Sequence, residues 1–247
     1  MKKKAFLVGA INAGSVAESL GVEGVYPEAE EIMASRDIVI AETNKLHTHI
    51  CHISTETSVN MIRSAKQRGV NVTCETCPHY FSFTVDEVLT SGVNAKMNPP
   101  LREEKDRKAI IEGLKDGTID CLITDHAPHA KEEKDKGLVS APNGIIGFET
   151  ALAAVITNLI KPGHINYIDA VRFLSYRPAQ ILGLDNRGQI KEGYKADFTI
   201  FNPDDEYVYT EDMIVSKSKN SPWIGKKLIG RVIYTIVDGR IVYSYDK

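Results

Sequence analysis

Residues 124–129 of the 247-residue chain are Thr-Asp-His-Ala-Pro-His, so one carboxylate and two imidazoles stand close together. They follow the apolar run 119–123, which predicts a short buried strand. Titratable groups at the carboxyl end of such a strand are typical of parallel-sheet enzymes, which place their chemistry at that edge. The pattern favours a hydrolytic site. A turn capped by Asp125, with solvated histidines, explains the same six residues equally well.

His52 is the second candidate, because it lies near the end of another predicted strand, 49–53. The carboxyl ends of parallel strands meet at one edge of a sheet, so the His52 imidazole is expected on the same side as Asp125. Imidazole nitrogen and carboxylate oxygen are ordinary zinc ligands. The two residues could therefore share one metal ion. A purely structural role for His52 is the alternative.

Other residues of metal-binding type indicate structure rather than chemistry. His47 and His49 alternate along a strand and face the same way, but they stand at its beginning, the wrong end for a parallel-sheet site. We expect both to be surface or structural histidines. Cys74 and Cys77 have the spacing of a zinc or redox pair without a second pair, so core cysteines are expected. His79 lies in a predicted loop and has no evident partner.

Two further segments offer polar groups to a ligand. Asn98 precedes two prolines, which hold an extended, stiff segment. A side-chain amide fixed in this way can donate to and accept from a planar amide, although an ordinary turn explains the same residues. Asn143 and Gly144 open the segment 143–150, which supplies backbone groups at a predicted loop-to-helix junction. That segment suits either a polar ligand or a simple turn.

The elements that must position these residues alternate between strand-like and helix-like patterns, which predicts an α/β fold with a parallel sheet. Residues 131–143 are charged and without period, which predicts a mobile loop beside the candidate site. After Gly188 the pattern changes to short alternating strands, and a boundary is expected near residue 187. Helices are expected at 27–46, 57–68, from 85, at 103–115, 148–159 and 167–182; strands are expected at 49–53, 70–75, 119–125, 232–237 and 240–243.

Composition narrows the class of partner. The chain is 43% hydrophobic and 26% charged with a net charge of -3, so it is globular, and neither nucleic acid nor an anionic membrane is an expected partner. Small molecules fit better. The Met-Lys-Lys-Lys start is followed by too short an apolar stretch for a secretory signal. A cytoplasmic location with four reduced cysteines is therefore expected.

Taken in order, several segments closely resemble dihydroorotases of the amidohydrolase superfamily. The strings Asn-Pro-Pro-Leu-Arg and Thr-Asp-His-Ala-Pro-His favour dihydroorotases over the related allantoinases and hydantoinases. The resemblance runs over nearly the whole chain. The segments that carry it are 52–55, 77–79, 96–102, 124–129, 144–150 and 188–197.

This resemblance implies the reversible cyclisation of N-carbamoyl-L-aspartate to L-dihydroorotate in pyrimidine biosynthesis, on a (β/α)8 barrel with a Zn2+ centre. It implies that His52 and Asp125 are metal ligands and that Asp125 is also the catalytic acid/base. Metal-bound water would attack, and zinc would polarise the carbonyl. The implied substrate-binding residues are His129, which would pair with a substrate carboxylate, together with Asn98, Asn143 and Gly144.

The family pattern also has parts that would precede Met1: a first-strand His-x-His motif, a ligand-bearing middle strand and a further metal histidine. We therefore expect a C-terminal portion with about three of eight strands, as a partial barrel over 1–187 and a small β module over 188–247. Activity would then require the absent N-terminal segment from another chain, and a homo-oligomer is a further expectation. The alternative is a catalytically incompetent truncated homologue that acts as a binding or scaffold subunit.

Overall fold

The computed structural model describes residues 9–245, so the expectation for the Met-Lys-Lys-Lys start lies outside the described residues. The chain divides into two compact units. Unit 1 holds the chain up to Glu149 together with Glu211–Pro222, and unit 2 holds Thr150–Thr210 together with the chain from Trp223. Each unit is described by itself.

Unit 1 is built on a parallel sheet of three strands, β3 (Thr48–Ile50), β4 (Val72–Thr76) and β5 (Cys121–Leu122), in that order. Thr48 pairs with Val72, and Glu75 pairs with Cys121. The strands are shorter than the predicted ones, because only three residues of β3 and two residues of β5 pair with β4. The predicted order of strands and helices is confirmed, and unit 1 has the expected α/β character.

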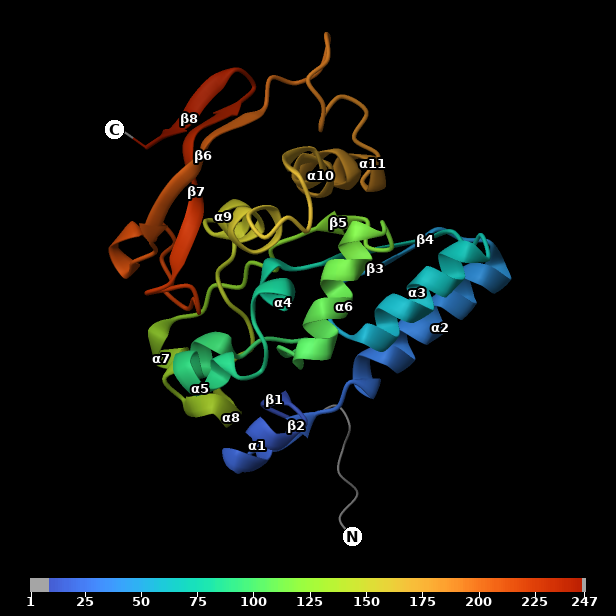
Figure 1. Ribbon diagram of the computed structural model, residues 1–247, viewed down its shortest axis with the longest axis vertical. Coiled ribbons are helices and arrows are strands. Elements are labelled where there is room, and N and C mark those ends of the chain that lie inside the picture. Colours follow the sequence, from blue (N-terminus) through green and yellow to red (C-terminus); the bar gives the residue numbers. More distant parts are fainter. Residues whose placement is uncertain (1–8, 246–247) are drawn as a thin grey trace. The chain divides into compact units, whose positions relative to one another are not determined.

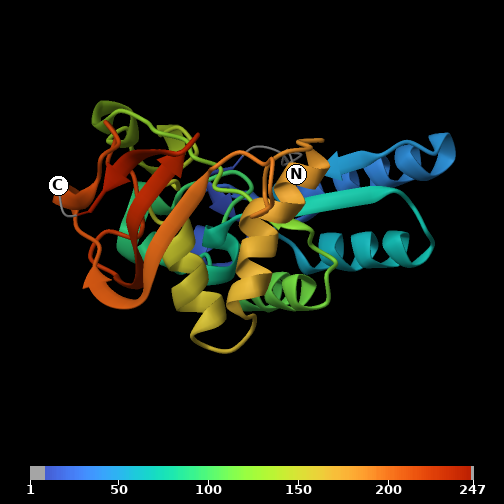
Figure 2. The ribbon, with the colours of Figure 1, turned by 90° about the horizontal axis from the view of Figure 1, so that it is seen from above.

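Three helices lie side by side along this sheet in chain order, α2 (Glu28–Asn44), α3 (Glu56–Gln67) and α6 (Glu104–Lys115) (Figures 1 and 2). Their predicted ranges agree with the observed ones within two residues at each end. The Thr55 hydroxyl caps α3 by accepting from the Ser58 amide at 3.1 Å. Gly69, in the left-handed region, follows the end of that helix.

The apolar positions of α3 and α6 form the core beneath the sheet. Val59, Ile62 and Ile110 are fully buried, as the helical spacing of these residues predicts. In α2 the buried residues are Ala34, Ile38 and Ala41. Four other apolar residues of α2, Ile32, Met33, Val39 and Ile40, are exposed.

Short elements complete unit 1. The range 131–143, predicted to be a mobile loop, contains two short helices, so that prediction is wrong in part. Their bounds, with those of the other short elements, are β1 (Ile11–Asn12), α1 (Ser15–Ser19), β2 (Gly24–Val25), α4 (Pro78–Ser82), α5 (Glu87–Ser91), η1 (Gly92–Ala95), α7 (Lys131–Lys134), α8 (Gly137–Ser140) and η4 (Glu211–Met213).

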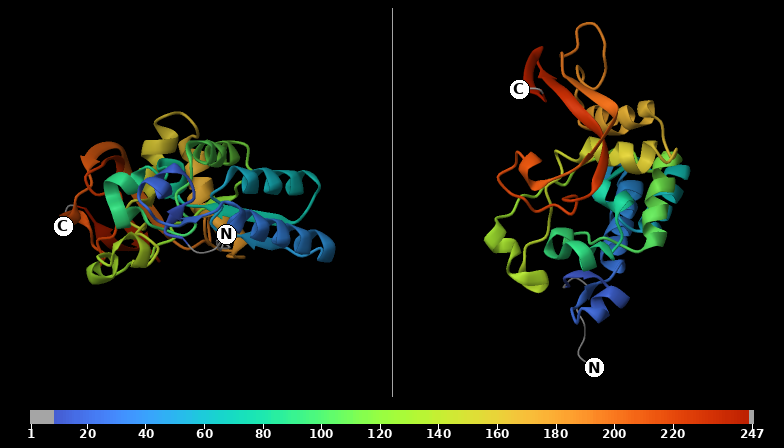
Figure 3. Two further views of the ribbon diagram at one scale, coloured as in Figure 1. Left: turned by 90° about the horizontal axis from the view of Figure 1, so that it is seen from below. Right: turned by 60° about the vertical axis from the view of Figure 1, so that its left-hand side comes forward.

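Unit 2 contains two helical stretches and an antiparallel sheet. The sheet has the order β6 (Phe198–Val208), β7 (Lys227–Val237) and β8 (Arg240–Ser244), and α9 lies beside β7 (Figure 3). Both helical stretches were predicted, and each contains a π-helical segment. Their parts are α9 (Ala151–Val155) with η2 (Ile156–Ile160), and α10 (Tyr167–Val171) with η3 (Arg172–Tyr176) and α11 (Arg177–Ile181).

The compact units and the predicted domains divide the chain differently. Residue 187 lies inside unit 2, and Glu211–Pro222 packs with unit 1 although it follows the start of the predicted β module. Packing into units is a different property from independent folding, so the domain division at 187 stays a prediction. Every helix within residues 9–245 is too short or too polar to cross a membrane.

Candidate active site

His52 and Asp125 come together at the carboxyl edge of the parallel sheet. His52 lies two residues after β3 and Asp125 three residues after β5. The His52 Nε2 atom is 3.8 Å from Asp125 Oδ1, and both side chains are about one-third exposed. The expected meeting of these two groups at one sheet edge is therefore observed.

Both residues hold strained backbone conformations. His52 has φ of 57° and Asp125 has φ of 46°, in the left-handed region that residues other than glycine rarely adopt. Such conformations persist where surrounding structure over-determines them, and they concentrate at functional sites. Here the amide of Ile53, directly after His52, donates to the Glu75 carbonyl at 2.9 Å. The sheet thus fixes the direction in which the imidazole leaves the strand.

Glu75 is a central residue of this edge that the sequence did not single out. Its Oε2 lies 3.0 Å from His49 Nε2 and its Oε1 lies 3.4 Å from His52 Nδ1. The parallel register places His49 opposite Thr73, so the side chains of His49 and Glu75 share one face of the sheet. Position along one strand gave no sign of this pair, because it forms between strands.

Cysteine side chains surround the same carboxylate. Within residues 9–245, one group of three residues, His49, Glu75 and Cys121, has potential metal-ligand atoms all within 4.8 Å of one another. Cys77 Sγ lies 3.8 Å from His52 Nδ1. Burial raises the pKa of the Cys77 thiol well above its usual value, with smaller contributions from the nearby carboxylates.

All four cysteines are free, and Cys74 and Cys77 are buried. The expectation of core cysteines is confirmed. The redox or zinc pair that their spacing also allowed is not formed, because Cys74 Sγ donates to the Thr118 carbonyl at 3.4 Å while Cys77 faces His52.

The second group of predicted residues meets beside residues 124–129. His129 Nε2 lies 2.8 Å from the Asn143 carbonyl oxygen, and the Gly144 amide donates to the Lys96 carbonyl at 2.9 Å. These contacts place the segments that carry Asn98, His129 and Gly144 side by side. The side chain of Asn98 is exposed, and the peptide bond after it is cis.

Glycine is required at positions 144 and 147 for this packing. A Cβ on Gly144 would lie 2.5 Å from the Ala127 Cβ, and its φ is 124°. A Cβ on Gly147 would lie 2.6 Å from the Thr124 carbonyl oxygen. The Gly147 amide also donates to His126 Nδ1 at 3.0 Å. Close approach of the two segments therefore depends on two missing side chains.

Asn220 holds the same two segments together, and sequence analysis missed it. Its Nδ2 donates to the carbonyls of Ala127 at 2.9 Å and Gly144 at 3.0 Å, and its Oδ1 accepts from the His129 amide at 3.3 Å. The residue is buried. It lies 76 to 93 residues along the chain from its partners, so no local pattern could have indicated it.

Two buried lysines fix the segment that was predicted to be mobile. Lys96 Nζ donates to the Ala141 carbonyl at 2.5 Å, and Lys134 Nζ donates to the carbonyls of Pro142 and Gly144, both at 3.1 Å. Burial and, to a smaller extent, the neighbouring charge of Lys96 together lower the pKa of Lys134 to about 8. The ordered short helices of this segment follow from these contacts.

His79 lies in the core below the site. It is 2% exposed, and among the described residues its Nε2 has no hydrogen-bond partner. Burial lowers its pKa to about 3, with a smaller effect of the charge on His52. The segment of His79, predicted to be a loop, is the short helix α4.

The residues of the strand-end pair fit a divalent cation. Two ligand atoms bound to one tetrahedral zinc ion at about 2.0–2.2 Å stand roughly 3.3–3.6 Å apart, and the observed separation of His52 Nε2 and Asp125 Oδ1, 3.8 Å, is slightly longer. An imidazole nitrogen and a carboxylate oxygen are suitable donors.

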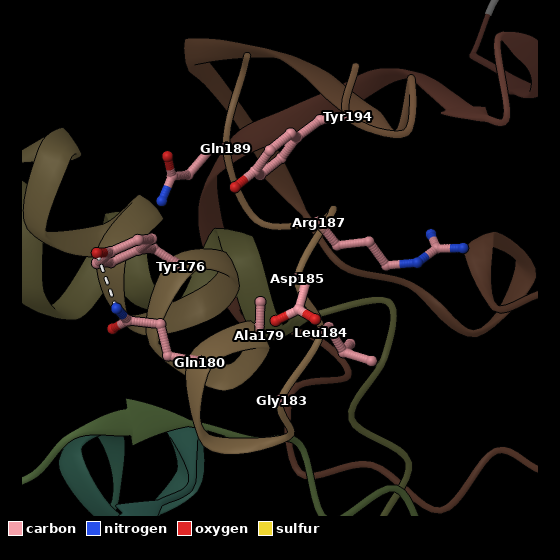
Figure 4. Close-up of a pocket in the computed structure, with 9 residues that line it drawn as sticks. All are labelled: Tyr176, Ala179, Gln180, Gly183, Leu184, Asp185, Arg187, Gln189 and Tyr194. Atoms are coloured by element: carbon pink, nitrogen blue, oxygen red, sulfur yellow. Dashed lines mark hydrogen bonds between the residues drawn. The ribbon is translucent and has the colours of Figure 1, made fainter. Parts of the chain in front are cut away.

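A separate cavity of about 340 Å³ lies in unit 2. Figure 4 shows its lining, in which Gln180 Nε2 donates to the Tyr176 hydroxyl at 2.8 Å. None of the predicted site residues lines it. The lining residues are Tyr176, Ala179, Gln180, Gly183, Leu184, Asp185, Arg187, Gln189 and Tyr194.

A parallel sheet flanked by helices, with a histidine and an aspartate at its carboxyl edge, is the arrangement of a metal-dependent hydrolase. Residues 14–242 match the Amidohydrolase family, and the chain belongs to that family. Among curated relatives, it is 48% identical over 234 residues to a dihydroorotase from Clostridium acetobutylicum. The matched region covers 95% of this chain and 55% of the relative. The chain is 50% identical over 238 residues to a dihydroorotase from Geotalea daltonii, covering 96% and 56%.

Solved structures show the same family likeness. An L-hydantoinase from Arthrobacter aurescens has a TM-score of 0.83 and 28% identity, over 87% of this chain and 48% of its own. A dihydropyrimidinase from Brevibacillus agri has a TM-score of 0.82 and 25% identity, over 90% and 50%. The chain spans about half the length of the relatives that it matches. The predicted resemblance to dihydroorotases is confirmed.

Proposed function

We propose that this chain carries the C-terminal part of a zinc-dependent dihydroorotase that interconverts N-carbamoyl-L-aspartate and L-dihydroorotate in pyrimidine biosynthesis. The main support is the His52–Asp125 pair at the sheet edge, in a chain 48% identical to a curated dihydroorotase. We place the protein in the cytoplasm, in line with its expected small-molecule substrate. The three parallel strands would be the last three of a (β/α)8 barrel, within 1–187, and 188–247 would form the small β module.

His52 and Asp125 would hold the cation, which when bound supplies a Lewis acid that polarises a carbonyl and makes water more acidic. In hydrolysis, Asp125 would take a proton from the attacking water and deliver it to the departing ring nitrogen. In ring closure it would move the proton in the opposite direction. Its carboxylate, about one-third exposed at the strand end, is reachable by a substrate.

The neighbouring segments would orient the substrate. His129 would pair with the substrate carboxylate, since its imidazole is held by the Asn143 carbonyl at 2.8 Å. Asn143 and Asn98, both exposed, would contact the ureide, whereas Gly144 would act by letting its segment pass close to Ala127. Agreement with dihydroorotases over 95% of the chain favours this enzymatic function over a scaffold subunit. A complementing N-terminal segment would supply the remaining barrel strands, and the exposed edge of the sheet would favour a homo-oligomer.

The test is an assay of dihydroorotate hydrolysis with zinc, using the full chain alone and mixed with the N-terminal half of the Clostridium acetobutylicum relative. We expect turnover in the mixture, and its loss by at least a hundredfold in Asp125→Asn. His164→Gln, in unit 2, is the matched histidine control for His52→Gln and should retain activity. A folded, zinc-loaded mixture without turnover would contradict the proposal.

A further inference from the structure

Glu75 lies between two imidazoles, and its contacts carry an inference that rests on the proposed metal role of His52. We propose that Glu75 is a positioning residue whose carboxylate accepts from His52 Nδ1–H and from His49 Nε2–H, so that the lone pair of His52 Nε2 faces Asp125. The carboxylate is about one-tenth exposed. Its direction is therefore set by protein contacts rather than by water.

The argument begins with what a carboxylate can do. Its two oxygens only accept hydrogen bonds, so an imidazole nitrogen that faces one of them must carry the hydrogen. Glu75 Oε1 lies 3.4 Å from His52 Nδ1 and Oε2 lies 3.0 Å from His49 Nε2. A neutral imidazole has one N–H, which leaves a lone pair on His52 Nε2. That lone pair and the Asp125 carboxylate, 3.8 Å away, are two acceptors facing one site, an arrangement that suits a cation.

The far side of His49 agrees with this direction. If His49 Nε2 carries the hydrogen, His49 Nδ1 accepts, and the Thr73 hydroxyl 2.8 Å away donates to it. Thr73 Oγ1 then accepts from His47 Nε2, at 3.0 Å. Every contact from His47 to His52 thus has a donor and an acceptor. Carboxylates that orient metal-binding histidines in this way commonly alter metal affinity by 10–100-fold.

Two competing arrangements make different predictions. Cys77 Sγ lies 3.8 Å from His52 Nδ1 and, as a donor, would move the imidazole hydrogen to Nε2. It is the longer contact and a weaker donor, so the Glu75 contact is expected to prevail. The second competitor is a cation bound by His49, Glu75 and Cys121, whose potential ligand atoms lie within 4.8 Å of one another. That cation would require a lone pair on His49 Nε2.

Nitrogen NMR of the full chain labelled with 15N-histidine separates these arrangements without any activity measurement. The chain has seven histidines, assigned by single His→Gln variants. Spectra of the metal-free protein at about pH 9 observe neutral rings, since the ordinary imidazole pKa is about 6.5. For His52 we expect the hydrogen on Nδ1 (pyrrole-type) and a lone pair on Nε2 (pyridine-type). For His49 we expect the hydrogen on Nε2 and a lone pair on Nδ1. A pyridine-type Nδ1 in His52 overturns the proposal.

Glu75→Gln tests the cause. An amide accepts at its oxygen but donates at its nitrogen, so it can serve only one of the two imidazoles as an acceptor. We expect either His49 or His52 to change tautomer in this variant. Glu112→Gln, an exposed change on α6, is the matched control and should leave all seven tautomers unchanged. Unchanged tautomers in a folded Glu75→Gln protein overturn the proposal.

Zinc added to the same labelled samples completes the test. In the wild type we expect the shift at His52 Nε2, while Nδ1 keeps its hydrogen. A shift at His49 Nε2 that Cys121→Ser removes would show that Glu75 serves the three-residue site, and would overturn the proposal. No zinc response in the reconstituted protein would count against the proposed function, whereas the metal-free tautomers would still decide the role of Glu75.

Discussion

Around the backbone that follows β3, the charged side chains of Arg102 and Glu30 are largely buried and each has several partners. Arg102 is 3% exposed and lies 3.6 Å from Glu30, while its Nε donates to the Ser54 hydroxyl at 3.0 Å. On the antiparallel sheet of unit 2, Lys227 pairs with Glu206, and each of these side chains is at least half exposed. The first arrangement fixes the backbone that follows β3, whereas the second covers a surface. Buried polar contacts therefore mark the part of the molecule where precise placement matters.

The largest difference between the buried and the exposed ion pair is expected when one charge is removed from each. Arg102→Met leaves the Glu30 carboxylate buried without its cation, and we expect the free energy of unfolding to fall by about 3–5 kcal/mol. Lys227→Met removes an exposed pair and should change it by less than about 1 kcal/mol. Denaturant unfolding of both variants measures the difference. Equal effects would remove the distinction between the two regions.

Asn220 offers the same comparison without a charge. Asn220→Ala removes three hydrogen bonds, after which the Gly144 carbonyl keeps Lys134 Nζ while the Ala127 carbonyl and the His129 amide lose this partner, and a loss of about 2–3 kcal/mol is expected. Asn202→Ala, on β6, removes an exposed contact to the Asp204 amide and should have little effect. Thermal unfolding compares the two. A stable Asn220→Ala protein would show that the segments of Ala127 and Gly144 do not need this clamp.

Acid should weaken the core of unit 1 through His79. Its pKa is about 3 in the folded protein and about 6.5 when unfolded, so the unfolded chain binds the extra proton between these values. Stability is therefore lost as the pH falls below about 6.5, by about 2 kcal/mol at pH 5. The difference in the free energy of unfolding between the wild type and His79→Phe, measured with urea from pH 8 to 5, isolates this contribution. A constant difference across that range would contradict the buried, neutral imidazole.

Lys134 should produce a smaller effect at alkaline pH. Its pKa is about 8 in the folded protein, below the value of 10.5 for an ordinary lysine, so the folded protein releases the proton first. Below about pH 8 the folded protein holds Lys134 in its charged form, which burial disfavours. As the pH rises from about 8 toward 10.5 the folded protein loses this proton, so its free energy of unfolding relative to Lys134→Met should rise. Hydrogen exchange of the amides of residues 137–144 would show the same trend locally. A fall with rising pH would contradict it.

The contrast between the regions also explains what sequence could predict. The long helices Glu28–Asn44, Glu56–Gln67 and Glu104–Lys115 follow from periodic apolar residues and from local caps, which neighbours in sequence determine. His52 and Asp125 were predicted to meet because parallel strands end at one edge. Their separation is observed, whereas their catalytic roles stay predictions.

What sequence did not reveal depends on distant partners. Glu75 meets His49 through the register of two strands, and Asn220 reaches Gly144 from far along the chain. The segment 131–143 has no apolar period, and its order comes from two lysines that donate to backbone carbonyls. Polar contacts of this kind have no fixed spacing, so periodicity cannot predict them.

The left-handed backbone of His52 and Asp125 sets stability against function at the two positions proposed to bind metal. Glycine adopts these angles without strain, so a glycine at either position would relieve the chain while deleting the imidazole or the carboxylate. Selection for stability alone would favour glycine at these two positions. Retention of the two side chains therefore costs conformational energy, and an engineer who seeks thermostability should leave both positions untouched.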